Sequence, residues 1–219
     1  MVDSKLGGEA MATIERGHRT RERLLDIAER AVLEKGVGAT SIEEIVAAAE
    51  ITRGGFFYHF KSKHALAHAL LRRHIDLECR MQDQIMDWAF RRTDDPLQAC
   101  LIGLEMLANY HASSRSAHYG RLLATICYHE CMFDREIREL YREAASSWRM
   151  RYLGLLNQIL SRYRPRDTIC IEHLADSLPA IADGAAMLSR VRADPRILPQ
   201  QILIARSYLK LLFSPDRAA

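Results

Sequence analysis

The chain has 219 residues, of which 48% are hydrophobic, 27% are charged and 7% are aromatic. This length and apolar content are sufficient for one globular unit or two small ones with a hydrophobic core. The 11 glycines and 6 prolines are few, and apolar residues recur every three or four positions from about Arg19 onward, which excludes collagen-like, disordered and strand-rich chains. The sequence therefore predicts an all-α fold.

Charge and hydropathy narrow the class of protein further. Lys and Arg number 31 against 28 for Asp and Glu, so any contact with nucleic acid must come from a local group of residues. No apolar run approaches the roughly 18 residues of a membrane helix, and the N-terminus lacks the layout of a signal peptide. The five cysteines form an odd, scattered set, which is typical of reduced thiols. These features predict a cytoplasmic protein.

The N-terminal part of the chain contains signals for a flexible arm followed by three helices. Gly36 follows the first periodic segment and tolerates the left-handed backbone that ends a helix. Ser41 and Thr52 each precede a short segment in which a hydroxyl can cap the first turn of a helix. Only Glu50 and Ile51 join these two segments, an arrangement typical of a helix-turn-helix. We expect an arm over 1–17 and helices over about 19–35, 41–49 and 52–60.

The rest of the chain is also predicted to be helical. A long helix is expected over about 63–91, and the sequence Thr93-Asp-Asp-Pro96 ends it. We expect a small N-terminal domain over 18–77 and a larger C-terminal domain over 78–219. Pro179 lies inside a predicted helix and is expected to kink it. The helices of the larger domain are expected over about 97–112, 117–131, 134–163, 169–192 and 196–213.

The third predicted helix has an unusual composition. Its sequence, Thr52-Arg-Gly-Gly-Phe-Phe-Tyr-His-Phe60, opens with two glycines and continues with aromatic rings that cannot all face one core. A recognition helix enters the major groove of DNA with its N-terminal residues first, and glycines let its backbone approach closely. The residues expected to contact DNA are Thr40, Ser41, Thr52, Arg53, Gly54, Gly55, Phe56, Tyr58, His59, Lys61 and Lys63.

Several short motifs follow one another in a specific order between Arg19 and Leu70. They are Arg23-Leu-Leu-Asp-Ile-Ala28, Glu34-Lys-Gly36, Ala39-Thr-Ser-Ile-Glu-Glu-Ile45, Ala49, Ile51-Thr-Arg-Gly54, Gly55-Phe-Phe-Tyr-His-Phe60, Lys63 and Leu66. This ordered series resembles the N-terminal domain of the tetracycline-repressor (TetR) family of transcriptional regulators. The resemblance implies a three-helix DNA-binding domain followed by a helical domain that binds a ligand and dimerises.

The chain departs from the family pattern at three positions. It has Glu50 where the family usually has glycine, Phe57 where it has tyrosine and His64 where it has glutamate. A left-handed backbone at Glu50 would cost on the order of 1 kcal/mol relative to glycine. Phe57 lacks the hydroxyl that family members often direct at a phosphate, so we expect Phe57 in the core and assign phosphate contacts to Tyr58 and Lys63.

The resemblance also implies sites in the C-terminal domain. Family members enclose a small-molecule effector there and dimerise through their last two long helices, and the aromatic content here favours an apolar or aromatic effector. The residues expected to line the effector pocket are Met106, Tyr110, Tyr119, Ile126, Tyr128, Trp148 and Tyr152. Those expected at the dimer interface are Leu174, Leu178, Ile181, Ala185, Leu188, Ile202, Ala205, Leu209 and Leu212.

A pair of cysteines provides an alternative reading. Cys127 and Cys131 are four residues apart on one helical face, a spacing that could hold a soft metal or report oxidation. His129 lies two residues from each, nearly on the opposite side of the helix, so the three cannot easily bind one ion. We interpret the cysteines as buried and inert, and we expect neither a metal nor a cofactor.

No motif of an enzyme is present. The sequence lacks a glycine-rich phosphate loop, a His-Glu-x-x-His zinc motif and a Gly-x-Ser-x-Gly elbow. The predicted function is that of a homodimeric repressor that is released from a palindromic operator in double-stranded DNA by a small effector. Two alternatives remain: a metal- or thiol-responsive sensor on the same scaffold, and a helical interaction protein that has lost operator binding, which Glu50 favours.

Overall fold

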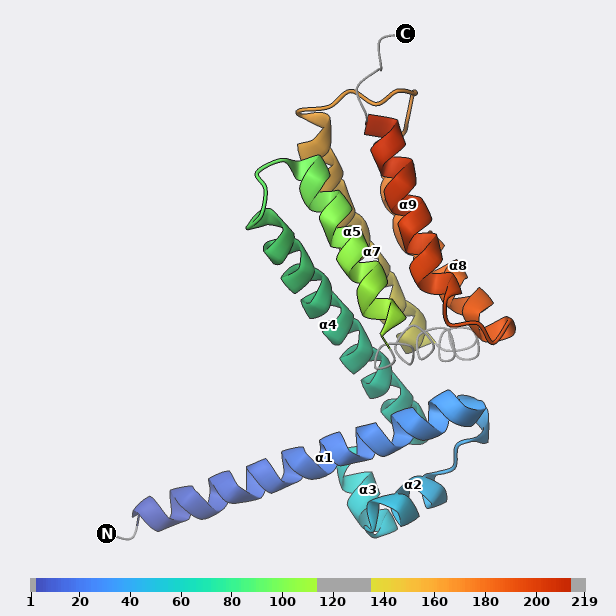
Figure 1. The fold of residues 1–219 in the computed structure, drawn as a ribbon. Helices are drawn as coiled ribbons and strands as arrows, with labels where there is room; N and C mark the ends of the chain where they lie inside the picture. Colours follow the sequence, from blue (N-terminus) through green and yellow to red (C-terminus); the bar gives the residue numbers. More distant parts are fainter. Residues whose placement is uncertain (1–2, 114–134, 214–219) are drawn as a thin grey trace. The chain divides into compact units, whose positions relative to one another are not determined.

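The computed structural model describes residues 3–113 and 135–213, with side chains from Glu15 onward (Figure 1). Every regular element in these ranges is an α-helix, which confirms the predicted all-α class. The chain forms two compact units, Met1–Arg73 and His74–Ala219. The first contains α1 (Asp3–Ala39), α2 (Ile42–Ala49), α3 (Arg53–His59) and the beginning of α4 (Lys63–Phe90).

Helix α1 begins earlier than the sequence pattern indicated. It starts at Asp3, so residues 3–17, expected to be an arm, have helical backbone in the structure. Residues 9–16 are rich in Ala, Met, Glu and Arg, which favour helix and supply no stop signal. Gly36 interrupts the helix with φ 87° and ψ 164°, which confirms the predicted break there.

The core of the first unit is formed by apolar side chains three or four residues apart on each helix. This spacing places them on one face of each helix, and burial of such a face provides most of a small domain's stability. These buried residues are Leu24, Leu25 and Ala28 of α1, Ile45 and Ala49 of α2, Phe56 and the adjoining Phe60 of α3, and Leu66, Leu70 and Leu71 of α4.

One arginine links the two long helices of this unit electrostatically. Arg73 of α4 donates hydrogen bonds to three carboxylates of α1, at 3.3 Å to Glu22, 2.8 Å to Asp26 and 2.5 Å to Glu29. Only 18% of the Arg73 side chain is exposed. Its planar guanidinium can serve several acceptors at once, so this one side chain ties α4 to three successive acidic positions on α1.

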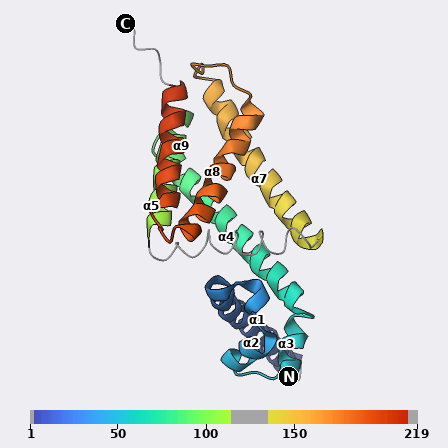
Figure 2. The same cartoon turned by 90° about the vertical axis from the view of Figure 1, so that its right-hand side faces the viewer.

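The second unit is a helical bundle. Helix α5 (Pro96–Ala112) packs against α9 (Ile197–Phe213), and α8 (Ile171–Val191) packs against both α9 and α7 (Arg135–Leu160) (Figure 2). Asp95 caps α5 by accepting the N–H of Leu97 at 2.9 Å. Helix α8 continues through Pro179 without a break. In the part of the chain that the structure describes, no helix is both long and apolar enough to cross a bilayer.

The residues expected at the dimer interface lie largely in the bundle's own core, which corrects that prediction. Seven of the nine are buried within the chain, Ile181 is half-buried, and only Leu188 is exposed. Helices α8 and α9 are apolar on more than one face, so periodicity along the sequence did not distinguish the face that packs inward. The buried seven are Leu174, Leu178, Ala185, Ile202, Ala205, Leu209 and Leu212.

Candidate nucleic-acid interface and ligand cavity

The turn between α2 and α3 is closed by backbone hydrogen bonds and capped by hydroxyls. Glu50 adopts a left-handed conformation with φ 51° and ψ 43°, and the N–H of Ile51 donates to the carbonyl of Val46 at 3.2 Å. Thr52 accepts the N–H of Gly55 at 3.1 Å, so it caps α3 as predicted. This local geometry sets the direction in which α3 leaves the turn.

The aromatic residues of α3 divide between the core and the surface. Phe56 is fully buried and contacts Phe60 with ring centroids 5.9 Å apart, whereas Phe57 is 39% exposed and Tyr58 is 83% exposed. The prediction that Phe56 contacts DNA and Phe57 lies in the core is therefore wrong, and the two positions are exchanged. Successive residues of a helix point about 100° apart, so a run of rings could not show which one faces inward.

Arg53 lies on the exposed face of α3 within a network of local contacts. Its guanidinium is 3.2 Å from a carboxylate oxygen of Glu43 and 5.7 Å from the ring centre of Phe57. Both charged side chains are more than 60% exposed, since the values are 69% for Arg53 and 65% for Glu43. An exposed ion pair is weak, so Arg53 can exchange Glu43 for an anionic partner at little cost.

The other predicted contact residues differ in how accessible they are. Thr40 is buried and its hydroxyl donates to the carbonyl of Gly36 at 2.9 Å, so a direct contact with DNA is wrong for this residue. Ser41 is exposed, although its hydroxyl accepts the N–H of Glu44. Lys63 is half-buried and its ammonium donates to the carbonyl of Gly38 at 2.9 Å.

Lys61 and His59 complete the charged and polar surface near α3. Lys61 is exposed and His59 is half-buried. Burial lowers the pKa of His59, and the positive charge of Arg21 lowers it further. His59 is therefore neutral at physiological pH, and it can donate or accept a hydrogen bond without a charge.

Nothing within the domain requires glycine at position 54. Gly54 is exposed, its backbone does not need a positive φ, and an added Cβ would meet only the hydroxyl of Thr52 at 3.8 Å. Gly55 is also free of a close internal contact, since a Cβ there would come no nearer than 3.5 Å to the same hydroxyl. Glycine in a helix costs about 1 kcal/mol relative to alanine. The absence of an internal reason is consistent with a molecule outside the domain approaching the backbone here.

Comparison with known proteins agrees with this geometry. Residues 24–70, which form the core of the first unit, match the profile of the family described as bacterial regulatory proteins, tetR family. The first unit is therefore similar to the N-terminal domain of TetR-family proteins, which are bacterial regulatory proteins.

Individual TetR-family proteins are similar over part or most of the chain. The transcriptional regulator AcrR of Shigella flexneri is 30% identical over 128 residues, 58% of this chain and 57% of AcrR. TtgR of Pseudomonas putida is 27% identical over 143 residues, 62% of this chain and 61% of TtgR. The chain thus spans about three-fifths of each relative. A TetR-family structure from Agrobacterium tumefaciens has the same fold, with a TM-score of 0.72 and 16% identity over 90% of this chain and 100% of that one.

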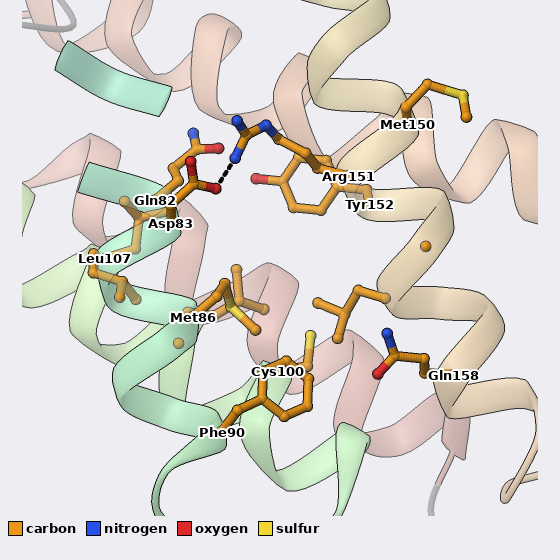
Figure 3. Close-up of a pocket in the computed structure, with 15 residues that line it drawn as sticks. Gln82, Asp83, Met86, Phe90, Cys100, Leu107, Met150, Arg151, Tyr152 and Gln158 are labelled. Atoms are coloured by element: carbon orange, nitrogen blue, oxygen red, sulfur yellow. Dashed lines mark hydrogen bonds and ion pairs between the residues drawn. The ribbon is translucent and has the colours of Figure 1, made fainter. Parts of the chain in front are cut away.

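A cavity of about 300 Å³ lies in the second unit (Figure 3). It lies between α4, α5 and α7, and its wall is mainly apolar, with the ion pair between Asp83 and Arg151 at one side. Small apolar clefts between helices of a bundle are typical ligand sites. Among the described residues its lining includes Met86 and Phe90 of α4, Cys100, Leu104 and Leu107 of α5, and Met150, Tyr152, Leu155 and Gln158 of α7.

The predicted effector-pocket residues are only partly at this cavity. Tyr152 lines it, and Trp148 lines a smaller cavity that adjoins it. Met106 and Tyr110 line neither of these two cavities, so their assignment to an effector pocket stays a prediction. The remaining predicted residues lie outside the described residues: Tyr119, Ile126 and Tyr128, together with Cys127 and Cys131.

The sequence reasoning missed the contribution of α4 to the cavity. Met86 and Phe90 were treated as parts of a helix that only connects two domains, although their spacing of four places them on one helical face. Burial raises the pKa of the Cys100 thiol to about 12, so this cysteine is not a reactive thiolate. Within residues 15–113 and 135–213, no group of three His, Cys, Asp or Glu side chains could hold a metal ion.

Proposed function

We propose that this chain is a homodimeric transcriptional repressor that acts in the cytoplasm, binds a palindromic operator and is released by a small ligand. The observation that carries this proposal is the exposed face of α3, where Arg53, Gly54 and Tyr58 lie on a helix held by its cap and by the buried Phe56. A short, rigid helix with an accessible N-terminal turn is suited to the major groove.

The exposed residues divide into two groups by the contacts that we assign to them. Arg53 and Tyr58 are the candidates for base edges, since an arginine can bind guanine with two hydrogen bonds. Lys61 and Lys63 are the candidates for phosphates, and Lys63 must first exchange its hydrogen bond with Gly38. Phosphate contacts add affinity for any duplex and depend on salt, whereas base contacts select the sequence.

A homodimer requires a surface for the partner, and α8 and α9 offer one that shares only Leu188 with the predicted residues. We call it the α8–α9 face: its large apolar side chains are all at least 40% exposed. Two copies of a recognition helix must be about 34 Å apart to read consecutive major grooves, and a homodimer with a twofold axis provides two such copies. The α8–α9 face consists of Met187, Leu188 and Val191 of α8 and Leu203, Ile204, Tyr208 and Leu211 of α9.

The response to a ligand follows from the course of α4. This helix begins at Lys63, next to α3 in the chain, and provides Met86 and Phe90 to the cavity wall. A ligand that prefers one arrangement of the bundle therefore acts on the helix that also belongs to the DNA-binding unit. Moving the population from mostly bound to mostly free requires a difference of about 5 kcal/mol in ligand affinity between the two forms.

Selection of bound duplexes from a random DNA pool tests the proposal. The purified protein, shown to be folded by circular dichroism, is expected to enrich an inverted repeat. Failure to enrich any sequence, both before and after denaturation and refolding to remove a bound ligand, would contradict the proposal and favour a helical interaction protein.

The variant Gly54→Ala sharpens this test because the two consequences have opposite directions. We expect the free energy of unfolding to rise by roughly 0.5–1 kcal/mol, because alanine replaces glycine in a helix with no internal clash. Affinity for the selected operator is expected to fall at least about tenfold, because the new methyl group meets the DNA. An operator affinity equal to that of the wild type would remove Gly54 from the interface.

A further inference from the structure

A second, smaller cavity adjoins the first and has a different chemical character. Its volume is about 50 Å³, and it shares Gln82, Leu107 and Tyr152 with the larger cavity. The additional lining residues include two carboxylates, an imidazole and an indole, provided by Glu78 of α4, His111 of α5, Trp148 of α7 and Asp183 of α8. The two cavities thus form an apolar space with a polar end.

The polar end contains acidic side chains. His74 faces Glu78, with Nε2 3.3 Å from a carboxylate oxygen. Burial opposes ionisation of Glu78, but the charge and hydrogen bond of His74 outweigh it, so the pKa of this carboxyl lies below its ordinary value. Asp183 accepts a hydrogen bond from the hydroxyl of Tyr141. Among the described residues that line the small cavity are the two acidic side chains of Glu78 and Asp183 and neither a lysine nor an arginine.

Two buried nitrogen atoms at this end have no hydrogen-bond partner. They are Nδ1 of His111 and Nε1 of Trp148. The two residues are 9% and 4% exposed, respectively. Burial lowers the pKa of His111, so its imidazole is neutral and Nδ1 can accept a hydrogen bond. Buried polar atoms are normally paired, because leaving one unpaired costs about 1–3 kcal/mol. These two atoms therefore point to a polar group of a ligand that completes the site.

We infer that the effector is a cationic amphiphile: an apolar or aromatic body in the larger cavity and a protonated amine bound between Glu78, Asp183 and His111. This inference rests on the proposed function, of which it specifies the ligand class. An ammonium group has three N–H donors and no acceptor, and the site offers two carboxylates and Nδ1 of His111. An acceptor atom next to the amine would pair with Nε1–H of Trp148.

The same site disfavours other ligands of equal size. A carboxylate ligand would meet Glu78 and Asp183, and like charges at close range in a buried site repel strongly. A neutral alcohol can donate only one hydrogen bond to the acidic side chains of Glu78 and Asp183.

Calorimetric binding of three matched compounds to the full-length protein without DNA tests the inference. Phenylbutylamine, phenylbutanol and phenylbutyrate share one apolar body and differ only in the charge of the end group. We expect the amine to bind at least about tenfold more tightly than the alcohol, and the acid to bind most weakly. Equal affinities, tighter binding of the alcohol or acid, or no binding of any of the three would overturn the inference.

The variant Asp183→Asn assigns the preference to this site. Asparagine keeps an oxygen that accepts from Tyr141 and replaces the carboxyl group, so the amine is expected to lose most of its advantage over the alcohol. Asp176→Asn is the matched control, because Asp176 is an exposed residue of the same helix, paired with Arg149. An unchanged preference in Asp183→Asn would overturn the assignment. Selection of an operator does not involve these compounds, so its result tests the proposed function independently of the ligand class.

Discussion

Glu50 occupies a backbone conformation that glycine adopts more easily. Its φ of 51° lies in the left-handed region, and the turn hydrogen bonds of α2 depend on it. The side chain contributes little, since its carboxylate is 84% exposed and 3.8 Å from Arg23. The strain that the sequence predicted at this position is therefore present, and the turn forms despite it.

The substitution Glu50→Gly is expected to stabilise the protein. The free energy of unfolding should rise by about 0.5–1 kcal/mol, because glycine relieves the left-handed strain. The greater conformational entropy of glycine in the unfolded chain offsets part of this stabilisation. Urea unfolding followed by circular dichroism measures this. Glu50→Ala is the control: it also removes the contact with Arg23 but keeps a Cβ, so it should not be more stable than the wild type.

Asp183 provides a prediction about pH. Burial raises the pKa of its carboxyl above the ordinary 3.8, despite the hydrogen bond from Tyr141. Above pH 3.8, the folded protein therefore retains a proton that the unfolded chain has released, and stability decreases as pH rises through the raised pKa. Asp183→Asn has no proton to lose, so its stability relative to the wild type should increase with pH, by about 1.4 kcal/mol per unit of raised pKa. Urea unfolding of both proteins between about pH 4 and about pH 8 measures this difference in the free energy of unfolding. A difference that does not change with pH would contradict the prediction.

The helices of the first unit are held by a polar clamp as well as by their apolar faces. Arg73 on α4 has three acidic partners on α1, spaced four and three residues apart along one side of that helix. Removing the arginine would leave Glu22, Asp26 and Glu29 close together without their shared cation. The clamp therefore matters more than an ordinary surface ion pair.

We expect Arg73→Met to lower the free energy of unfolding by about 1–3 kcal/mol, because methionine keeps the apolar stem and removes the charge. Chemical unfolding of the full chain measures the change. The variant Arg80→Met serves as the control, since Arg80 is an exposed residue of the same helix and its loss should change stability by no more than about 0.5 kcal/mol. Equal effects of the two variants would show that the clamp contributes nothing specific.

Assembly of two chains depends on the apolar side chains that α8 and α9 leave exposed. Ile204 and Leu211 are 58% and 63% exposed, and they lie seven residues apart on one face of α9. Exposed apolar side chains that cluster in this way mark an interaction surface. In a dimer built on the α8–α9 face, they would be buried against the partner.

Ile204→Asp is therefore expected to weaken the dimer about a hundredfold or more, because a buried unpaired carboxylate is costly. Sedimentation of the purified protein should show a monomer at concentrations where the wild type is a dimer, and operator affinity should fall with it. Met150→Asp is the matched control, since Met150 is 66% exposed on α7, outside the α8–α9 face. If both variants remain dimeric, the partner binds elsewhere.

Much of the fold could be predicted because neighbouring residues decide it. The helical periodicity, the caps at Ser41 and Thr52, the break at Gly36 and the turn at Glu50 all depend on contacts within a few positions along the chain. The helix-turn-helix and its recognition helix follow from the same signals, which is why they were found without coordinates.

Packing decided the features that sequence reasoning missed. Phe56 rather than Phe57 is buried, and α9 buries Leu209 while it exposes Tyr208, because each helix rotates to fit partners that are distant in sequence. The polar end of the cavity likewise gathers Glu78, His111 and Asp183 from three different helices. Their separation along the chain carries no periodic signal, so this site exists only once the helices have packed.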